Sequence, residues 1–71
     1  MPQEREYQWD ALLTAQEVAD LVRVHVYTFQ RWCRRGEGPL ETRLGEVRRY
    51  AESDVRRWIS SRQRAPREEV A

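Results

Sequence analysis

Two short apolar patterns with a helical repeat, separated by residues 23–25, constrain the fold of this chain more than any other feature. The apolar positions of the first pattern are Ala15, Val18, Ala19, Leu21 and Val22. Those of the second, which spans about Val26 to Arg35, are Val26, Phe29, Trp32 and Cys33. Both sets follow the period of an amphipathic helix. The stretch from Leu13 to Pro39 therefore predicts two short helices packed across a tight turn.

The residues at the ends of these helices support this prediction. Thr14 and Glu17 have the spacing of a capping box, with the apolar Leu13 ahead of the cap. His25 stands where the second helix would be capped, and Gly36 is a natural residue just beyond its end. Each predicted helix thus has a start or stop signal of its own.

The rest of the chain predicts a hairpin and a third helix. Two strand-like pieces, Leu40 to Leu44 and Val47 to Tyr50, flank Gly45-Glu46, which suits a type II′ turn. A third helix is expected from about Glu52. Its apolar stripe consists of Val55, Trp58 and Ile59, and its outer side carries Arg56, Arg57 and Arg62. Pro66 disfavours helical structure in the residue before it.

We therefore expect a mainly α fold with a small β-hairpin: three helices and a two-stranded wing, which is a winged helix-turn-helix. The predicted boundaries are an N-terminal arm at 1–11, the domain at 12–64 and a flexible tail at 65–71. The predicted core consists of Val18, Leu21, Phe29, Trp32, Leu44, Tyr50, Val55, Trp58 and Ile59.

The charges of this 71-residue chain are segregated although its net charge is only +1. Residues 23–64 hold eleven arginines and five acidic residues, whereas residues 1–22 hold one arginine and five acidic residues. Lysine is absent, and arginine suits bidentate contacts to phosphate and guanine. A cationic segment of this kind favours a polyanionic partner. The alternative is a solvated face that carries charges of both signs.

The second helix and the hairpin provide the candidate DNA contacts, because the second helix of a helix-turn-helix enters the major groove. The candidates on that helix are Tyr27, Thr28, Gln30, Arg31, Arg34 and Arg35. Those in the turn and the wing are Arg23, His25, Arg43, Arg48 and Arg49. The alternatives are that the helix arginines only solubilise an exposed face, and that the hairpin arginines pair with Glu41 and Glu46.

Other functional classes have little support in the sequence. His25 and Cys33 are the only residues of their types, without the spacing of a metal site or of a nucleophile with its base. We expect no enzymatic activity, no metal and no cofactor. Cys33, Trp32 and Trp58 are expected to be core residues. Neither a signal peptide nor a membrane-spanning segment is visible, which favours a cytoplasmic location.

The residues LLTAQEVADLVRV, TFQRWCRRG, RLGEVRRY and SDVRRWI resemble, in this order, the excisionase-type winged helix-turn-helix family. That family is related to the DNA-binding domains of MerR-type and AlpA-type regulators. The resemblance covers about residues 12–62. Two residues depart from the pattern: Arg23 and His25 stand in the turn where the family often has glycine and serine.

The resemblance implies a recombination directionality factor on double-stranded DNA in a bacterial host cell. Such a protein binds repeated sites beside a phage attachment site, bends the DNA and directs an integrase or other recombinase towards excision. The alternatives are a small phage or prophage transcriptional regulator with the same fold, and a protein-interaction module that binds an acidic partner. We also expect cooperative head-to-tail self-association on DNA, with the acidic Glu4, Glu6 and Asp10 of one copy facing a basic surface of the next.

Overall fold

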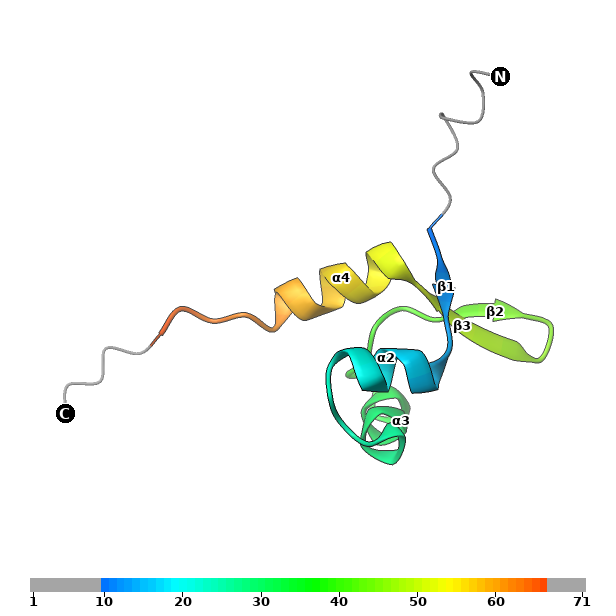
Figure 1. Ribbon diagram of the computed structural model, residues 1–71, viewed down its shortest axis with the longest axis horizontal. Helices are drawn as coiled ribbons and strands as arrows, with labels where there is room; N and C mark the ends of the chain where they lie inside the picture. The colour runs from blue at the N-terminus through cyan, green and yellow to red at the C-terminus, as the bar shows by residue number, and fades with distance from the viewer. Residues whose placement is uncertain (1–9, 67–71) are drawn as a thin grey trace, which may run out of the picture.

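The computed structural model describes residues 10–66 and divides them into three helices and three short strands. In chain order these are β1 (Leu12–Leu13), α2 (Ala15–Leu21), α3 (Val26–Arg34), β2 (Thr42–Leu44), β3 (Val47–Ala51) and α4 (Glu52–Ser61) (Figure 1). Helices α2 and α3 meet at the predicted turn, and the hairpin projects beyond them (Figure 1). The predicted winged helix-turn-helix is thereby confirmed.

The strands form one antiparallel sheet in the order β1-β3-β2. In the hairpin, Leu44 faces Val47 across a two-residue turn. Gly45 has a φ of 67°, whereas Glu46 has none of the positive φ that a type I′ turn would require, so the turn agrees with the predicted type II′. Strand β1 was not predicted. Leu13 lies opposite Tyr50, and β1 thus fastens the start of α2 to the middle of the sheet.

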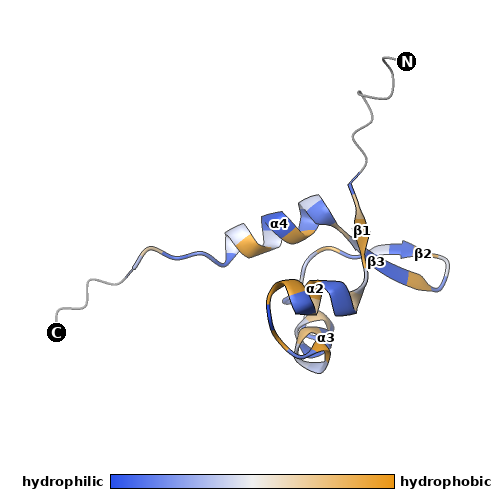
Figure 2. Cartoon of the chain, viewed as in Figure 1, coloured by the Kyte–Doolittle hydropathy of each residue, from blue (hydrophilic) through white to orange (hydrophobic). Residues whose placement is uncertain are grey.

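The core lies where α2, α3, β3 and α4 meet. Its buried apolar residues are Val18, Ala19, Phe29, Tyr50 and Val55. The ring of Phe29 makes edge contacts with the rings of Tyr50 and Trp58, at centroid distances of 5.3 and 5.9 Å. Hydrophobic and hydrophilic residues alternate along the helices, as expected when one side of each faces this core (Figure 2).

The predicted core was wrong at three positions. Leu21 is 59% exposed, Leu44 52% and Ile59 37%. Leu44 lies next to the turn of a hairpin that projects beyond the helices, and Leu21 and Ile59 lie near the ends of helices that are short. Trp32 and Trp58 pack against the core but are only half-buried, as is Cys33.

Two helix starts are capped by different means. The predicted capping box of α2 is confirmed: Glu17 N donates to Thr14 Oγ1 (3.0 Å), and Thr14 N donates to Glu17 Oε1 (2.9 Å). Helix α4 has no cap from its own flanking residue. Instead, Ser53 donates its backbone N–H (3.3 Å) and its hydroxyl to the Asp10 carboxylate.

Asp10 therefore belongs to the packed structure although the sequence placed it in the arm. Its neighbour Ala11 accepts a hydrogen bond from Glu52 N (2.9 Å), which adds a second link between the start of the chain and α4. The remaining residues of the predicted arm, 1–9, and residues 67–71 of the predicted tail lie outside the described residues.

Candidate nucleic-acid interface

The turn that leads into α3 is a hydrogen-bonded helix end with an unusual residue at its centre. Arg23 N donates to Asp20 O (3.1 Å) and Val24 N to Ala19 O (2.9 Å), which is the Schellman pattern. This pattern requires the left-handed conformation that glycine adopts most readily, and Arg23 has a φ of 61°. Arg23, which stands where the resembled family often has glycine or serine, is thus an exposed arginine in a strained conformation.

His25 caps α3, as the sequence predicts. Its Nδ1 accepts a hydrogen bond from Tyr27 N (3.1 Å), and its ring stacks on the Tyr27 ring at a centroid distance of 4.9 Å. These two contacts hold the imidazole against the first turn of α3.

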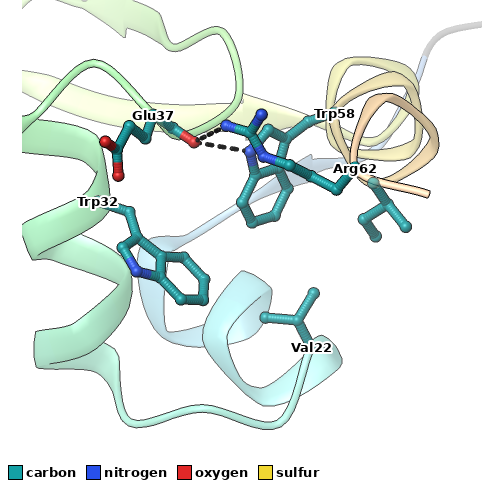
Figure 3. Close-up of a pocket in the computed structure, with 6 residues that line it drawn as sticks. Val22, Trp32, Glu37, Trp58 and Arg62 are labelled. Atoms are coloured by element: carbon teal, nitrogen blue, oxygen red, sulfur yellow. Dashed lines mark hydrogen bonds between the residues drawn. The ribbon is translucent and has the colours of Figure 1, made fainter. Parts of the chain in front are cut away.

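The end of α3 has the same Schellman pattern with the expected residue. Gly36 has a φ of 75°, Gly36 N donates to Cys33 O (3.0 Å), and Glu37 N donates to Trp32 O (2.8 Å). Glu37 O in turn accepts from Trp58 Nε1 (2.8 Å) and from Arg62 Nη2 (2.7 Å) (Figure 3). Helix α4 therefore holds this end of α3 in place.

The outward face of α3 is cationic and open. Tyr27 is 69% exposed, and Gln30, Arg31 and Arg34 are exposed as well. Arg31 and Arg34 have no carboxylate partner among residues 10–66, whereas Arg35 lies 3.8 Å from Glu37.

The sixth candidate on α3, Thr28, is only half-buried beside this face. As for the other candidates on the helix, its contact with DNA stays a prediction.

On the hairpin, two arginines pair with Glu41, which is the arrangement that the sequence offered as the alternative to DNA contact. Arg43 Nε donates to Glu41 Oε2 (3.2 Å), and Arg48 Nε lies 3.9 Å from the same oxygen. Arg49 is half-buried and donates to the carbonyl of Arg48 (2.8 Å). Glu46 makes no ion pair within the described part of the chain.

A cleft of about 530 Å³ joins the helix to the hairpin. Its lining consists of Ala15, Gln30, Cys33, Arg34, Glu41, Arg43, Arg48 and Tyr50. It brings together one arginine of the outward face of α3 and two of the wing, which lie far apart in the sequence. The candidates Arg23 and His25 lie at the opposite end of α3, and Arg49 does not line the cleft.

The floor of this cleft is uncharged at neutral pH. Cys33 Sγ and the Tyr50 hydroxyl lie 3.7 Å apart. Burial, and after it the hydrogen bond with Cys33, raises the pKa of Tyr50 to about 12. Burial also raises the pKa of the Cys33 thiol. The charges of the cleft are therefore three guanidinium groups and the carboxylate of Glu41.

The sequence pattern placed Cys33 and Tyr50 in the core, without a part in a cleft, and treated Glu41 only as a partner for surface arginines. The floor had no detectable signal, since Cys33 and Tyr50 meet only when α3 packs on the sheet. Residues 10–66 contain no group of three or more side chains that could hold a metal ion.

Comparison with known protein families identifies the fold independently. Residues 12–63 match the family model described as a helix-turn-helix domain. The chain belongs to this helix-turn-helix family. Among curated proteins, no sequence matches it. The family match covers β1, α2, α3, the hairpin and α4, and α3 is the second helix within it.

Membership of the helix-turn-helix family supports binding to double-stranded DNA. In this helix-turn-helix domain, the outward face of α3 and the cleft beside it form a cationic surface. Among the described residues, no helix has the length and apolar character needed to cross a membrane.

Proposed function

We propose that this helix-turn-helix domain places the outward face of α3 in the major groove of double-stranded DNA and its wing on the adjacent minor groove. The observation that carries the proposal is the exposure of Arg31 and Arg34, which have no carboxylate partner within residues 10–66. Arginine forms bidentate hydrogen bonds with the major-groove edge of guanine, and it also binds phosphate.

Arg23 supports the same proposal from the other end of α3. A residue other than glycine with a φ of 61° is strained, and such residues concentrate at functional sites. The exposed guanidinium is close to the start of the helix that enters the groove. We propose that Arg23 binds a backbone phosphate and that the wing arginines do the same, so that affinity falls steeply with salt.

The finer proposal is that the protein is an excisionase, a recombination directionality factor that binds repeated sites, bends DNA and directs an integrase. It is supported by the resemblance of the four sequence motifs. A single module of this size covers a short site, so useful specificity calls for several copies on neighbouring sites. The proposal includes no catalytic activity and no cofactor.

Head-to-tail self-association on DNA remains part of this proposal, but one of the three acidic residues expected to contact the next copy has a partner within its own chain. The carboxylate of Asp10 is engaged with Ser53 of the same chain. Glu4 and Glu6 therefore remain as the acidic residues that could face a second copy, and both lie outside the described residues. Unchanged cooperativity after neutralising both would remove this part of the proposal.

DNA binding is tested by fluorescence anisotropy with short duplexes across a salt series. We expect Arg31→Ala and Arg34→Ala to weaken binding by about 1–3 kcal/mol each if they contact base edges. Arg56→Ala is the matched control, because Arg56 is an exposed arginine on α4 that pairs with Glu52 (3.6 Å). Equal affinity of all four proteins would refute the placement of α3 in the groove.

Two further measurements separate the remaining functions. A footprint on candidate attachment-site DNA should have protected segments at regular intervals, and an integrase assay should produce more excision when the protein is added. A transcriptional regulator would bind DNA without changing excision. A module for an acidic protein partner would bind no duplex at moderate salt.

A further inference from the structure

The carboxylate of Glu41 occupies the position between the two wing arginines that line the cleft. The same oxygen, Oε2, lies 3.2 Å from Arg43 Nε and 3.9 Å from Arg48 Nε. The Glu41 side chain is 31% exposed, whereas those of Arg43 and Arg48 are 55% and 59% exposed. Glu41 is therefore the least exposed side chain of this cluster of three.

The register of the hairpin explains why an anion is favourable there. Arg43 and Arg48 are direct cross-strand partners in the pairing of β2 with β3. Like charges in directly opposite positions destabilise an antiparallel pair, and an anion between them removes the repulsion. Arg34 of α3 lines the same cleft, so a third guanidinium adds to the demand for negative charge.

The charge of Glu41 also acts on the floor of the cleft. After burial, which is the main cause, Glu41 contributes to raising the pKa of both Cys33 and Tyr50. Arg48 has the opposite effect on both groups.

We propose that Glu41 is an internal substitute for a DNA phosphate: it holds Arg43 and Arg48 in the free protein and is displaced from them when a backbone phosphate enters the cleft. The inference rests on the proposed DNA binding and assigns the cleft between α3 and the hairpin to a single phosphate. Carboxylate and phosphate oxygens compete for the same guanidinium donors. Glu41 thereby lowers the affinity of the wing for duplexes of any sequence and leaves discrimination to α3.

The competing role for Glu41 is to orient the two arginines for DNA, and it predicts the opposite result. If Glu41 competes with phosphate, its neutralisation strengthens DNA binding. If Glu41 orients the arginines, its neutralisation weakens binding. Because the two roles differ in sign, one pair of variants distinguishes them.

The test compares Glu41→Gln with Glu46→Gln by anisotropy on a random-sequence duplex. Both substitutions remove one negative charge from the same hairpin, but Glu46 lies in its turn without an ion pair among the described residues. We expect Glu41→Gln to tighten binding about fivefold and Glu46→Gln less than about twofold. Glu41→Asp keeps the charge with a shorter reach and should fall between the wild type and Glu41→Gln.

A double-mutant cycle with Arg48→Ala measures the coupling between Glu41 and Arg48 in DNA binding. A change of net charge alone would produce no such coupling. Arg48→Ala should weaken binding more in the Glu41→Gln background than in the wild type, because Arg48 is then free to bind phosphate fully. Equal effects in the two backgrounds would overturn the inference. So would weaker binding by Glu41→Gln, or a gain equal to that of Glu46→Gln.

Failure of the inference is distinguishable from failure of the proposed function. If the wild-type protein binds no duplex, the proposed function itself is wrong. If the wild type binds and only the Glu41 variants disagree, α3 keeps its role and Glu41 loses its own. Exposed ion pairs contribute little to stability, so the Tm of each variant should stay within about 3 °C of the wild type.

Discussion

The two turns at the ends of α3 have the same backbone hydrogen bonds and very different central residues. Arg23 occupies the left-handed position before α3 with a φ of 61°, and Gly36 occupies it after α3 with a φ of 75°. In each, two backbone N–H groups donate to the carbonyls of the preceding helix. The geometry of a helix end is therefore formed with either residue, although only glycine adopts it without strain.

The surroundings of the two turns differ as well. The turn after α3 is fastened to α4, because Glu37 O accepts hydrogen bonds from Trp58 and Arg62 (Figure 3). The turn before α3 exposes Arg23. The turn after α3 thus combines an unstrained glycine with fixed surroundings, whereas the turn before α3 combines a strained residue with an exposed cation that we propose to bind DNA. Four predictions test this comparison.

The largest expected effect comes from removing the side chain that fastens the second turn. Trp58→Ala should lower the free energy of unfolding by about 3 kcal/mol, because the ring contacts Phe29 and Trp32 and donates to Glu37 O. Trp58→Phe keeps an aromatic ring without the donor and should lose about 1 kcal/mol. Urea unfolding measures both. Equal losses would mean that the hydrogen bond to Glu37, not packing, holds α4 in place.

Gly36→Ala should destabilise the protein by about 1 kcal/mol, since alanine at a φ of 75° is strained. A side chain at Gly36 meets no other atom within 4 Å, so the loss would report the backbone alone. Thermal unfolding monitored by circular dichroism is the measurement. An unchanged Tm would mean that alanine at this position costs no stability. The glycine after α3 would then be no more favourable than another residue, and the contrast with Arg23 would disappear.

Arg23→Gly should change stability and DNA binding in opposite directions. Relief of the strained conformation is expected to raise the free energy of unfolding by about 0.5–1 kcal/mol. Loss of the phosphate contact should weaken DNA binding. It should also reduce the slope of log affinity against log salt concentration by about 1, because one counterion fewer is released. Arg23→Ala keeps the strain and loses the charge, so it should weaken DNA binding without the gain in stability. A glycine variant with unchanged affinity would leave the arginine without a function.

The smallest effect is expected at the cap of α3. His25→Ala removes the acceptor for Tyr27 N and should cost about 0.5–1 kcal/mol of stability. His25→Ser provides another capping oxygen and should restore most of that loss. Thermal unfolding of the three proteins under one buffer condition compares them. If serine fails to restore stability, the stacking of His25 on Tyr27 rather than the cap is what holds this turn.

Local sequence patterns predict much of this fold. The apolar repeats located α2, α3 and α4, and the capping box, His25 and Gly36 marked helix ends that the structure confirms. Each of these signals involves residues a few positions apart, so its physics acts within one turn of the chain. The hairpin around Gly45 was predictable for the same reason.

Contacts between distant residues were not predictable in this way. The Asp10 cap of Ser53 spans 43 positions, and β1 joins the sheet through only two residues, Leu12 and Leu13. Leu21, Leu44 and Ile59 satisfied the apolar pattern and still lie exposed. A pattern specifies which side of an element is apolar, but neighbouring elements decide how far that side is covered.

The candidate interface also combines features set by local sequence with contacts set by tertiary packing. The sequence by itself determined that α3 is amphipathic and that Tyr27, Arg31 and Arg34 share its polar side, because a helical period places them there. Only the tertiary structure decided that Arg34 meets Arg43 and Arg48 in one cleft and that Glu41 stands between the two wing arginines. Their proximity depends on the packing of α3 beside the hairpin. That packing results from contacts between residues far apart in the sequence, so no local pattern encodes it.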